Sequence, residues 1–465
     1  MLTYSFTDIG AESLYQHLYK CIKADILSGK LSVGTKLPSK RSFAKNLGIS
    51  TITVENAYAQ LLAEGYITSL PKKGYFVNQA ARQWVSTQPS FSCFDEPLPQ
   101  PTRYLADFVT SQTNPDNFPF STWAKLMREI IAERSTDLMR NPPGAGISEL
   151  RTAICNHLRQ FRNMDIAPGQ VVIGAGTEYL YGLIIQLLGY DKVYAVENPG
   201  YRKASQIFRS NHVECRYAAM DHDGIRVDSL EEIGADIVHL SPAHHYPTGI
   251  ITPIGRRYEL LDWAAASGSR YIIEDDYDSE FRLTGRPIPM LQSIDCMEKV
   301  IYMNTFSKSL SSTIRVSYMI LPRHLMDRYA SDFSFYACTV SNFEQYTLAR
   351  FLQEGYFEKH INRMRTYYKG LRDALVDAIK KSPLSSRVRI TEENSGLHFL
   401  MQVDTTMSDE EIIRAASDRG IRIACLSQYY LDGSSAQEHV LVMNYSGLRT
   451  DNLPEAVDTL ADCFQ

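Results

Sequence analysis

Residues 271–278 read YIIEDDYD, a run of large and β-branched residues that passes directly into acidic ones. Such a run is typical of a buried strand, and similar runs lie on both sides of it, separated by segments with helical spacing. This alternation predicts an α/β architecture, in which a largely parallel sheet lies between layers of helices. The predicted strands are 170–176, 192–198, 214–220, 236–243, 271–276, 299–307 and 316–322.

Polar residues with chemical potential follow several of these strands. Asp275, Asp276 and Tyr277 end one strand, and Lys308 follows the next in TFSKS. Another strand ends in the small-residue turn GAGT (174–177), which opens a helix, and free backbone N–H groups at a helix start can bind phosphate. Since ligands of such sheets bind at the carboxyl ends of the strands, we expect these residues to form one site.

Composition excludes several classes of protein. The chain has 465 residues, of which 44% are hydrophobic and 22% charged, as in ordinary globular proteins. No apolar run reaches the length of a membrane helix, and the N-terminus does not resemble a secretion signal. The eight cysteines are scattered without a CxxC pair, which argues against a disulfide framework and a metal site. We expect a cytoplasmic protein.

The first 78 residues differ from the remainder in charge. They hold nine Lys and Arg against five Asp and Glu, whereas the rest of the chain holds 39 against 48. Helices are predicted over 13–28, from Ser39 to Gly48 and over 50–64, and a hairpin with the basic turn 71–74 follows. This order, with two helices joined by LGIS, predicts a winged helix-turn-helix whose partner is double-stranded DNA.

The run KLPSKRSFAKNLGISTITVENAYAQLLAEGYITSLPKKGYFV (36–77) resembles the GntR family of bacterial DNA-binding domains. The resemblance implies that the helix near Ser50 enters the major groove and that the hairpin wing reaches the minor groove. Position 51 is often Arg in that family and is Thr here, so a strong guanine-reading side chain is absent. The residues that the resemblance places at DNA are Ser39, Arg41, Ser50, Thr51, Thr53, Lys72, Lys73 and Gly74.

Residues 79–105 are rich in Pro, Ser and Gln and show neither helical nor strand periodicity. This composition predicts a linker between a DNA-binding domain at 1–78 and a body at 106–465. A linker of this length allows the head to lie on another subunit, and packing along its own body is the alternative.

The body resembles the fold-type I aminotransferases, which use pyridoxal 5′-phosphate (PLP). The shared order of motifs is GxGT, PGY, PxG, DDY and SK followed by Arg. With the N-terminal head, the chain resembles the MocR subgroup of GntR regulators, as LSPAHHYPTG, IEDDYDSEFR, NTFSKSL and HINRMRTYY also indicate. The resemblance implies a homodimer, and a small domain (about 106–165 with 350–465) that closes over the cofactor.

The resemblance also implies a role for each motif residue. Lys308 would form the Schiff base with PLP, and Asp275 rather than Asp276 would pair with the pyridinium nitrogen, because the family pattern is Asp-x-Tyr. Tyr277 would donate to the phenolate oxygen, Tyr201 would stack on the ring, and His245 or Tyr246 would face its oxygen edge. The predicted phosphate-binding residues are Gly176, Thr177, Glu178, Thr305, Ser307 and Arg315.

The usual substrate-carboxylate arginine has no counterpart on the predicted C-terminal strand, which reads EHVLVMNYSGLRT. Three functions remain open. The first is a transcription factor whose body senses PLP or an amino compound. The second is an aminotransferase with a DNA-binding head, and the third is a DNA-binding protein whose body only dimerises. The intact set of Lys308, Asp275, Tyr277 and Arg315 favours the first over the third, and the head favours the first over the second.

Overall fold

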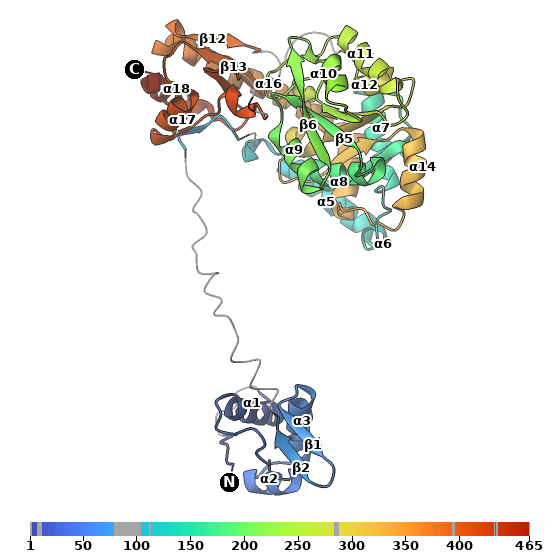
Figure 1. The fold of residues 1–465 in the computed structure, drawn as a ribbon, viewed down its shortest axis with the longest axis vertical. Coiled ribbons are helices and arrows are strands. Elements are labelled where there is room, and N and C mark those ends of the chain that lie inside the picture. The colour runs from blue at the N-terminus through green and yellow to red at the C-terminus, as the bar shows by residue number, and fades with distance from the viewer. Residues whose placement is uncertain are drawn as a thin grey trace. The chain divides into compact units, whose positions relative to one another are not determined.

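The structure is a computed structural model that describes residues 2–6, 12–78, 104–110, 113–282, 288–392, 396–431, 433 and 436–464. The chain divides into two compact units, Met1–Pro101 and Thr102–Gln465 (Figure 1). Most of the predicted linker lies outside the described residues. In the described part of the chain, no helix has both the length and the apolar character needed to cross a membrane.

The first unit has the predicted order of three helices and a hairpin. Its elements are α1 (Leu14–Leu27), α2 (Lys40–Leu47), α3 (Thr51–Ala63), β1 (Ile67–Leu70) and β2 (Gly74–Val77). The two serines that precede α2 and α3 cap them: Ser39 Oγ accepts from Ser42 N at 3.2 Å and Ser50 Oγ accepts from Thr53 N at 3.1 Å. Gly48 ends α2 in the left-handed conformation, with φ of 69°.

The head has its own apolar core, so it does not need the body to bury its helices. Leu18 and Ile22 of α1, Phe43 of α2 and Tyr58 of α3 are fully buried together. The hairpin β1–β2 pairs antiparallel with Leu70 opposite Gly74, and the turn between them carries Lys72 and Lys73.

The body contains an eight-stranded sheet in the order β4-β11-β10-β9-β8-β5-β6-β7. Strands β10, β9, β8, β5 and β6 are parallel, whereas β11 is antiparallel to both neighbours. Each strand from the sequence prediction is present. The bounds are β4 (Val171–Gly174), β5 (Val193–Asn198), β6 (Glu214–Asp221), β7 (Gly224–Ile225), β8 (Ile237–Leu240), β9 (Tyr271–Asp276), β10 (Val300–Thr305) and β11 (Ser317–Ile320).

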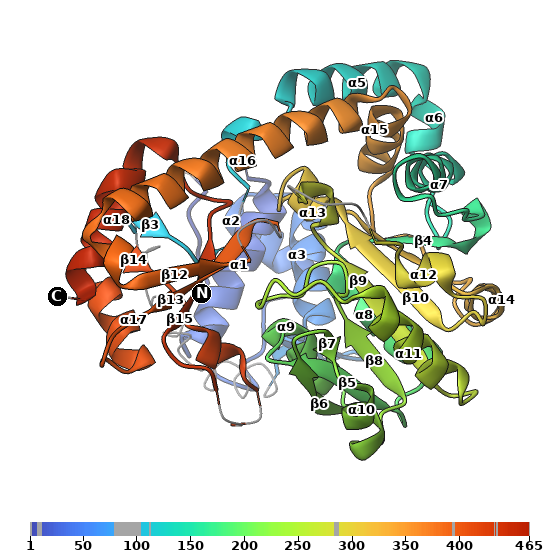
Figure 2. The ribbon, with the colours of Figure 1, turned by 90° about the horizontal axis from the view of Figure 1, so that it is seen from above.

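Strand alternation sends neighbouring side chains into different cores. In β5, Tyr194 and Val196 join one buried cluster and Ala195 joins another; in β9, Ile273 and Ile272 divide in the same way. The first cluster is covered by α8 (Thr177–Leu188), α9 (Arg202–Ser210) and α14 (Arg323–Asp332). The second is covered by α10 (Val227–Glu232), α11 (Ile254–Ala265) and α12 (Leu291–Ile294), as Figure 2 shows.

A smaller C-terminal part is built on a three-stranded sheet in the order β12-β13-β15. Next to it, β14 pairs parallel with β3, which joins residues more than 300 positions apart in the chain. The elements are β3 (Ala106–Asp107), β12 (Val388–Thr391), β13 (His398–Val403), β14 (Ile421–Arg422), β15 (Val440–Asn444), α17 (Asp409–Asp418) and α18 (Leu453–Ala461).

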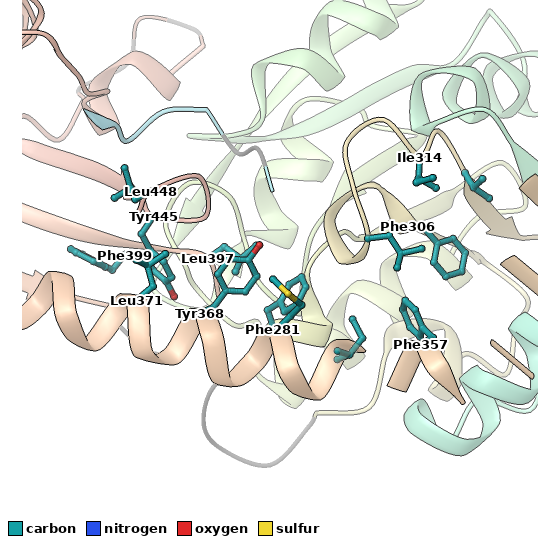
Figure 3. Packing of buried hydrophobic residues seen from close by; sticks show 14 of the residues in the cluster. Phe281, Phe306, Ile314, Phe357, Tyr368, Leu371, Leu397, Phe399, Tyr445 and Leu448 are labelled. Carbon is teal, nitrogen blue, oxygen red and sulfur yellow. The ribbon is translucent and has the colours of Figure 1, made fainter. Parts of the chain in front are cut away.

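The long helix α16 (Tyr356–Lys381) connects the two sheets of the body. Along one core, Phe357 lies 5.6 Å from Phe306, and Tyr368 lies 5.2 Å from Phe281, between ring centroids (Figure 3). Farther along the helix, Leu371 packs in the same cluster as Phe399 of the small sheet. The helix therefore carries one continuous apolar core from the large sheet to the small one.

The expected small domain of 106–165 with 350–465 is only partly right. The helices α5 (Phe120–Glu133) and α7 (Ser148–Arg162) pack with α15 (Asn342–Gln353), beside β4 of the large sheet, with the short α6 (Ser135–Leu138) next to them (Figure 2). Among the described residues of 106–165, β3 is the strand that pairs with a C-terminal strand. The apolar residues of α7, such as Leu150 and Ile154, find their partners near β4, and this contact cannot be seen from chain order.

Candidate functional site

A cavity of about 320 Å³ lies where the carboxyl ends of the parallel strands face the small sheet. This volume is within the range of small-molecule sites. Ten of the twelve predicted cofactor residues line it, and they lie at the carboxyl ends of five different strands or in the segments that follow these strands. These residues are Thr177, Glu178, Tyr201, Tyr246, Asp275, Tyr277, Thr305, Ser307, Lys308 and Arg315.

Lys308 lies in the one-turn helix α13 (Phe306–Ser309), directly after β10. Thr305 caps this helix by accepting a hydrogen bond from Ser307 N at 3.1 Å. Lys308 therefore lies close to the carboxyl end of β10. Burial lowers the pKa of Lys308 to about 8, although the charges of Asp278 and Asp275 oppose this shift. A larger fraction of this amine is neutral and nucleophilic near pH 8 than for an exposed lysine.

Asp275 lines the cavity, and only one of its two carboxylate oxygens has a hydrogen-bond partner among the described residues. Its Oδ2 accepts from Tyr181 Oη at 3.0 Å and lies 3.5 Å from His239 Nε2. Its Oδ1 is buried without a hydrogen-bond partner among the described residues. A buried acceptor of this kind is costly unless a donor from outside the chain reaches it.

The neighbouring Asp276 points to the opposite side of the strand. It accepts from Tyr302 Oη at 2.6 Å and lies 3.8 Å from Arg162 of α7, outside the lining of the cavity. Alternation along β9 thus separates the two carboxylates, as the sequence analysis expects for Asp275 and Asp276.

One end of the cavity is cationic. Arg315 and Lys203 lie there, and Glu178 at the start of α8 forms ion pairs with both. Gly176 is not among the lining residues but borders this end: its φ is 92°, and a Cβ at this position would collide with the Arg315 guanidinium. The glycine therefore allows Arg315 to lie against the backbone that opens the helix.

Three consecutive residues with ring side chains, His244, His245 and Tyr246, lie in the loop after β8, and their surroundings differ. Tyr246 lines the cavity and shares a hydrogen bond with Tyr429 at 2.7 Å between the hydroxyls. His245 does not line it; this ring is buried beside Thr248, 2.6 Å away, and burial lowers its pKa to about 3. Of the two predicted alternatives, Tyr246 has the position toward the cavity and His245 points away, because successive residues of this turn face opposite directions.

His244 instead lies beside the predicted Tyr277. Its Nδ1 is 3.3 Å from the Tyr277 hydroxyl and 2.9 Å from both carboxylate oxygens of Asp278. A Cβ on Gly396 would collide with this histidine, so the small domain closes tightly over the pair.

Sequence reasoning missed part of the lining. Lys203 and Asp278 lie close to the motifs PGY and DDY in the sequence, and this position could have indicated that they line the cavity. The side chains from the small domain had no such signal, because nothing in their local sequence indicates the large sheet. The missed residues are Val109, Lys203, Ser241, Asp278, Ser312, Leu397, His398 and Asn444.

The predicted DNA-binding residues lie in the two expected elements of the head. Arg41 and Thr51 are exposed at the starts of α2 and α3, and Lys72 and Lys73 are exposed at the tip of the hairpin. Thr53 is half-buried and bonds Ser50 at 2.8 Å between the hydroxyls. The hydroxyls of Ser39 and Ser50 cap their helices, so these two serines have a structural role in addition to any DNA contact.

Comparison with known proteins agrees with this two-part organisation. Residues 14–77 match the family of bacterial regulatory proteins of the gntR type, and residues 110–460 match aminotransferase class I and II. The body resembles the crystal structure of a multiple substrate aminotransferase from Thermococcus profundus, with a TM-score of 0.67 and 23% identity over 78% of this chain and 92% of that one.

Two relatives match along both parts of the chain. The chain is 38% identical over 448 residues to the uncharacterized HTH-type transcriptional regulator YdeL of Bacillus subtilis (strain 168), covering 96% of each protein. It is 29% identical to the probable rhizopine catabolism regulatory protein MocR of Rhizobium meliloti, covering 97% of this chain and 94% of that protein. The chain therefore belongs to the MocR-type subgroup of the GntR family, transcriptional regulators that join a helix-turn-helix head to an aminotransferase-like body.

Proposed function

We propose that the body of this regulator binds PLP and that the head changes its affinity for operator DNA when PLP, or an amino compound that reacts with PLP, occupies the cavity. The observation that carries this proposal is that Asp275, Lys308 and Arg315 line one cavity, and that the buried Oδ1 of Asp275 has no hydrogen-bond partner among the described residues. A ligand that fits these three residues has a ring N–H donor, a group that reacts with an amine, and an anion.

PLP has this set of groups. Asp275 would accept from its ring nitrogen, Lys308 would react with its aldehyde carbon, and Arg315 with the first turn of α8 would hold its phosphate. Tyr201 and Tyr277 would lie against the ring and its oxygen. When bound, PLP supplies an aldehyde that captures primary amines and a ring that absorbs visible light.

The residues around Lys308 prepare its amine for this reaction. Burial makes the neutral form more abundant at moderate pH, and the nearby Asp278 and Asp275 keep the pKa from falling further. Leu397 and His398, at the start of β13 of the small sheet, line the same cavity as the Lys308 side chain.

The lining also favours one class of effector. The cations among the described lining residues are Lys203, Lys308 and Arg315, and two of them already pair with Glu178. No additional cation of the described lining is available for the carboxylate of an amino acid. We therefore infer that the effector is PLP itself or an amine that lacks a carboxylate.

The test is a spectral titration of the full-length protein with PLP, followed by borohydride reduction. Wild type should form a covalent, reducible adduct, and Lys308→Ala should lose it while remaining folded. Lys369→Ala, at an exposed position of α16, is the matched control and should behave as wild type. A reducible adduct that persists in Lys308→Ala would contradict the role of Lys308.

The response to ligand is tested separately by operator binding. The operator can be selected from random DNA by the wild-type protein, and binding isotherms are then measured with and without PLP or a simple amine. We expect the affinity, or transcription from the operator, to change for wild type, and Lys308→Ala to respond more weakly with unchanged basal binding. If neither measurement changes for wild type, the body does not act as a sensor.

We also propose that the regulator is a homodimer, because sites of this fold are built at a two-fold interface and a two-fold protein suits paired DNA half-sites. Sedimentation at micromolar concentration tests this, and a monomeric mass would contradict it.

A further inference from the structure

The cationic end of the cavity already contains an anion of the protein itself. The carboxylate of Glu178 accepts hydrogen bonds from Lys203 through Oε1 and from Arg315 through Oε2. The hydrogen bond from Lys203 lowers the pKa of Glu178, and the charge of Arg315 acts in the same direction, so the carboxylate is ionised at neutral pH.

Glu178 is also the second residue of α8, at the helix end whose dipole attracts negative charge. Arg315 lies against the backbone of Gly176, one residue before that helix. The helix N-terminus and both cations thus converge on one small region, and the side chain bound there is a carboxylate.

A phosphate needs the same donors. It carries up to two negative charges and bonds most strongly to guanidinium, ammonium and helix N–H groups. A phosphate at Arg315 must either displace Glu178 from its ion pairs or lie close to a like charge, and both lower its affinity.

We propose that Glu178 is an internal competitor for the phosphate of PLP, and that this competition sets the PLP concentration at which the cavity fills. The inference rests on the proposed binding of PLP and adds a residue that weakens it. Competition of this kind suits a sensor, whose cavity should fill only when the ligand is abundant and should empty when the ligand becomes scarce.

The main test compares wild type with Glu178→Gln in the full-length protein. Glutamine keeps the size of the side chain but has no charge, so Lys203 and Arg315 become available to phosphate. We expect the dissociation constant for PLP, from absorbance titration, to fall by on the order of 10-fold. Inorganic phosphate should also raise the melting temperature of the variant more than that of wild type.

Pyridoxal, which lacks the phosphate, distinguishes competition from a general change in the site. Its affinity should be the same in wild type and in Glu178→Gln. Equal tightening of pyridoxal and PLP would overturn the proposal, and so would weaker PLP binding by the variant, because Glu178 would then help to hold the ligand.

Glu149→Gln is the matched control. Glu149 is also the second residue of a helix, α7, and pairs with an arginine, Arg134, at 3.1 Å, but it does not line the cavity. This variant should leave PLP and phosphate binding unchanged. If wild type binds no PLP at all, the proposed function fails, whereas wild-type binding that Glu178→Gln leaves unaltered overturns only the role of Glu178.

Discussion

At the scale of single residues, side chains with the same functional group have different surroundings in and near the cavity. Lys308 is half-buried and Lys203 is exposed, and Asp275 lines the cavity whereas Asp276 lies beside Arg162 on the other side of β9. We therefore expect the same functional group to have a different role at each position.

The first prediction concerns the pH dependence of covalent PLP attachment. Only the neutral amine is nucleophilic, and the pKa of Lys308 is lowered to about 8, so the attachment rate should rise as pH increases to about 8 and then level off. Between pH 7 and pH 9 we expect about a 10-fold increase. Stopped-flow absorbance with excess PLP measures this rate.

Nα-acetyl-lysine under the same conditions is the reference, because its only amine is the side-chain amine with an ordinary pKa, and its rate should continue to rise above pH 9. A protein profile that follows Nα-acetyl-lysine would mean that burial does not tune Lys308.

The second prediction contrasts the two neighbouring aspartates. Asp275→Asn should weaken PLP binding by about 10- to 100-fold, because it replaces a charged acceptor facing the ligand, and should change stability little. Asp276→Asn should leave PLP binding nearly unchanged but reduce the free energy of unfolding by about 3 kcal/mol, because it removes a buried partner of Arg162.

Absorbance titration and chemical denaturation of both variants measure the two effects, and each variant is the control for the other. If the effects were reversed, Asp276 would be the residue that faces the ligand.

At the scale of elements, the helix α3, which is predicted to bind DNA, is preceded by a serine that caps it and is also predicted to contact DNA. Ser50 caps the helix, and the resemblance to GntR domains places the same serine at DNA. A substitution that preserves the cap but changes the charge can separate these two roles.

We predict that Ser50→Ala destabilises the first turn of α3 by about 1 kcal/mol, whereas Ser50→Asp keeps the cap and preserves stability. Operator affinity should fall in both variants and most in Ser50→Asp, because a carboxylate would face DNA phosphates. Hydrogen exchange of the α3 amides and operator binding by the full-length protein measure the two roles. Full operator affinity in Ser50→Asp would place Ser50 away from the DNA.

The long helix α16 shows why the body acts as one unit at this scale. Its apolar face packs on Phe306 and Phe281 near the cavity and on the small sheet farther along. Phe306, labelled in Figure 3, lies two residues before Lys308 in α13, so the apolar core along α16 extends to the short helix that carries the lysine.

At the scale of the whole molecule, the predicted DNA-binding residues and the cavity lie in two compact units, and the head has its own core. We predict that a fragment from residue 104 to the C-terminus binds PLP as the full chain does but does not retard the operator. The full-length protein should lose affinity steeply as salt increases, because its contacts are largely to phosphates.

Lys72→Ala and Lys73→Ala should each reduce the slope of log affinity against log salt by about one per head, while Lys369→Ala in the body should not. Gel retardation over a series of salt concentrations measures the slopes. Operator binding by the fragment, or operator binding that does not depend on salt, would contradict the prediction that the head binds DNA through phosphate contacts.

Local sequence patterns were sufficient for the helices and the hairpin of the head and for seven of the eight strands of the large sheet, because capping residues, apolar periods and strand ends are properties of short segments. The ten lining residues came instead from the motifs that the body shares with fold-type I aminotransferases. Parallel strands bring their carboxyl ends to one edge, so motifs far apart in the chain could be expected to meet.

Only the tertiary structure decided which distant segments complete the site. The lining residues His398 and Asn444, the pairing of β3 with β14, and the position of α7 beside β4 depend on contacts between residues far apart in the chain. The ion pairs of Glu178 with Lys203 and Arg315 could not be predicted from the sequence for the same reason. Glu178 of α8, Lys203 of α9 and Arg315 before β11 are far apart in the chain, and they become partners only when the sheet brings these segments together.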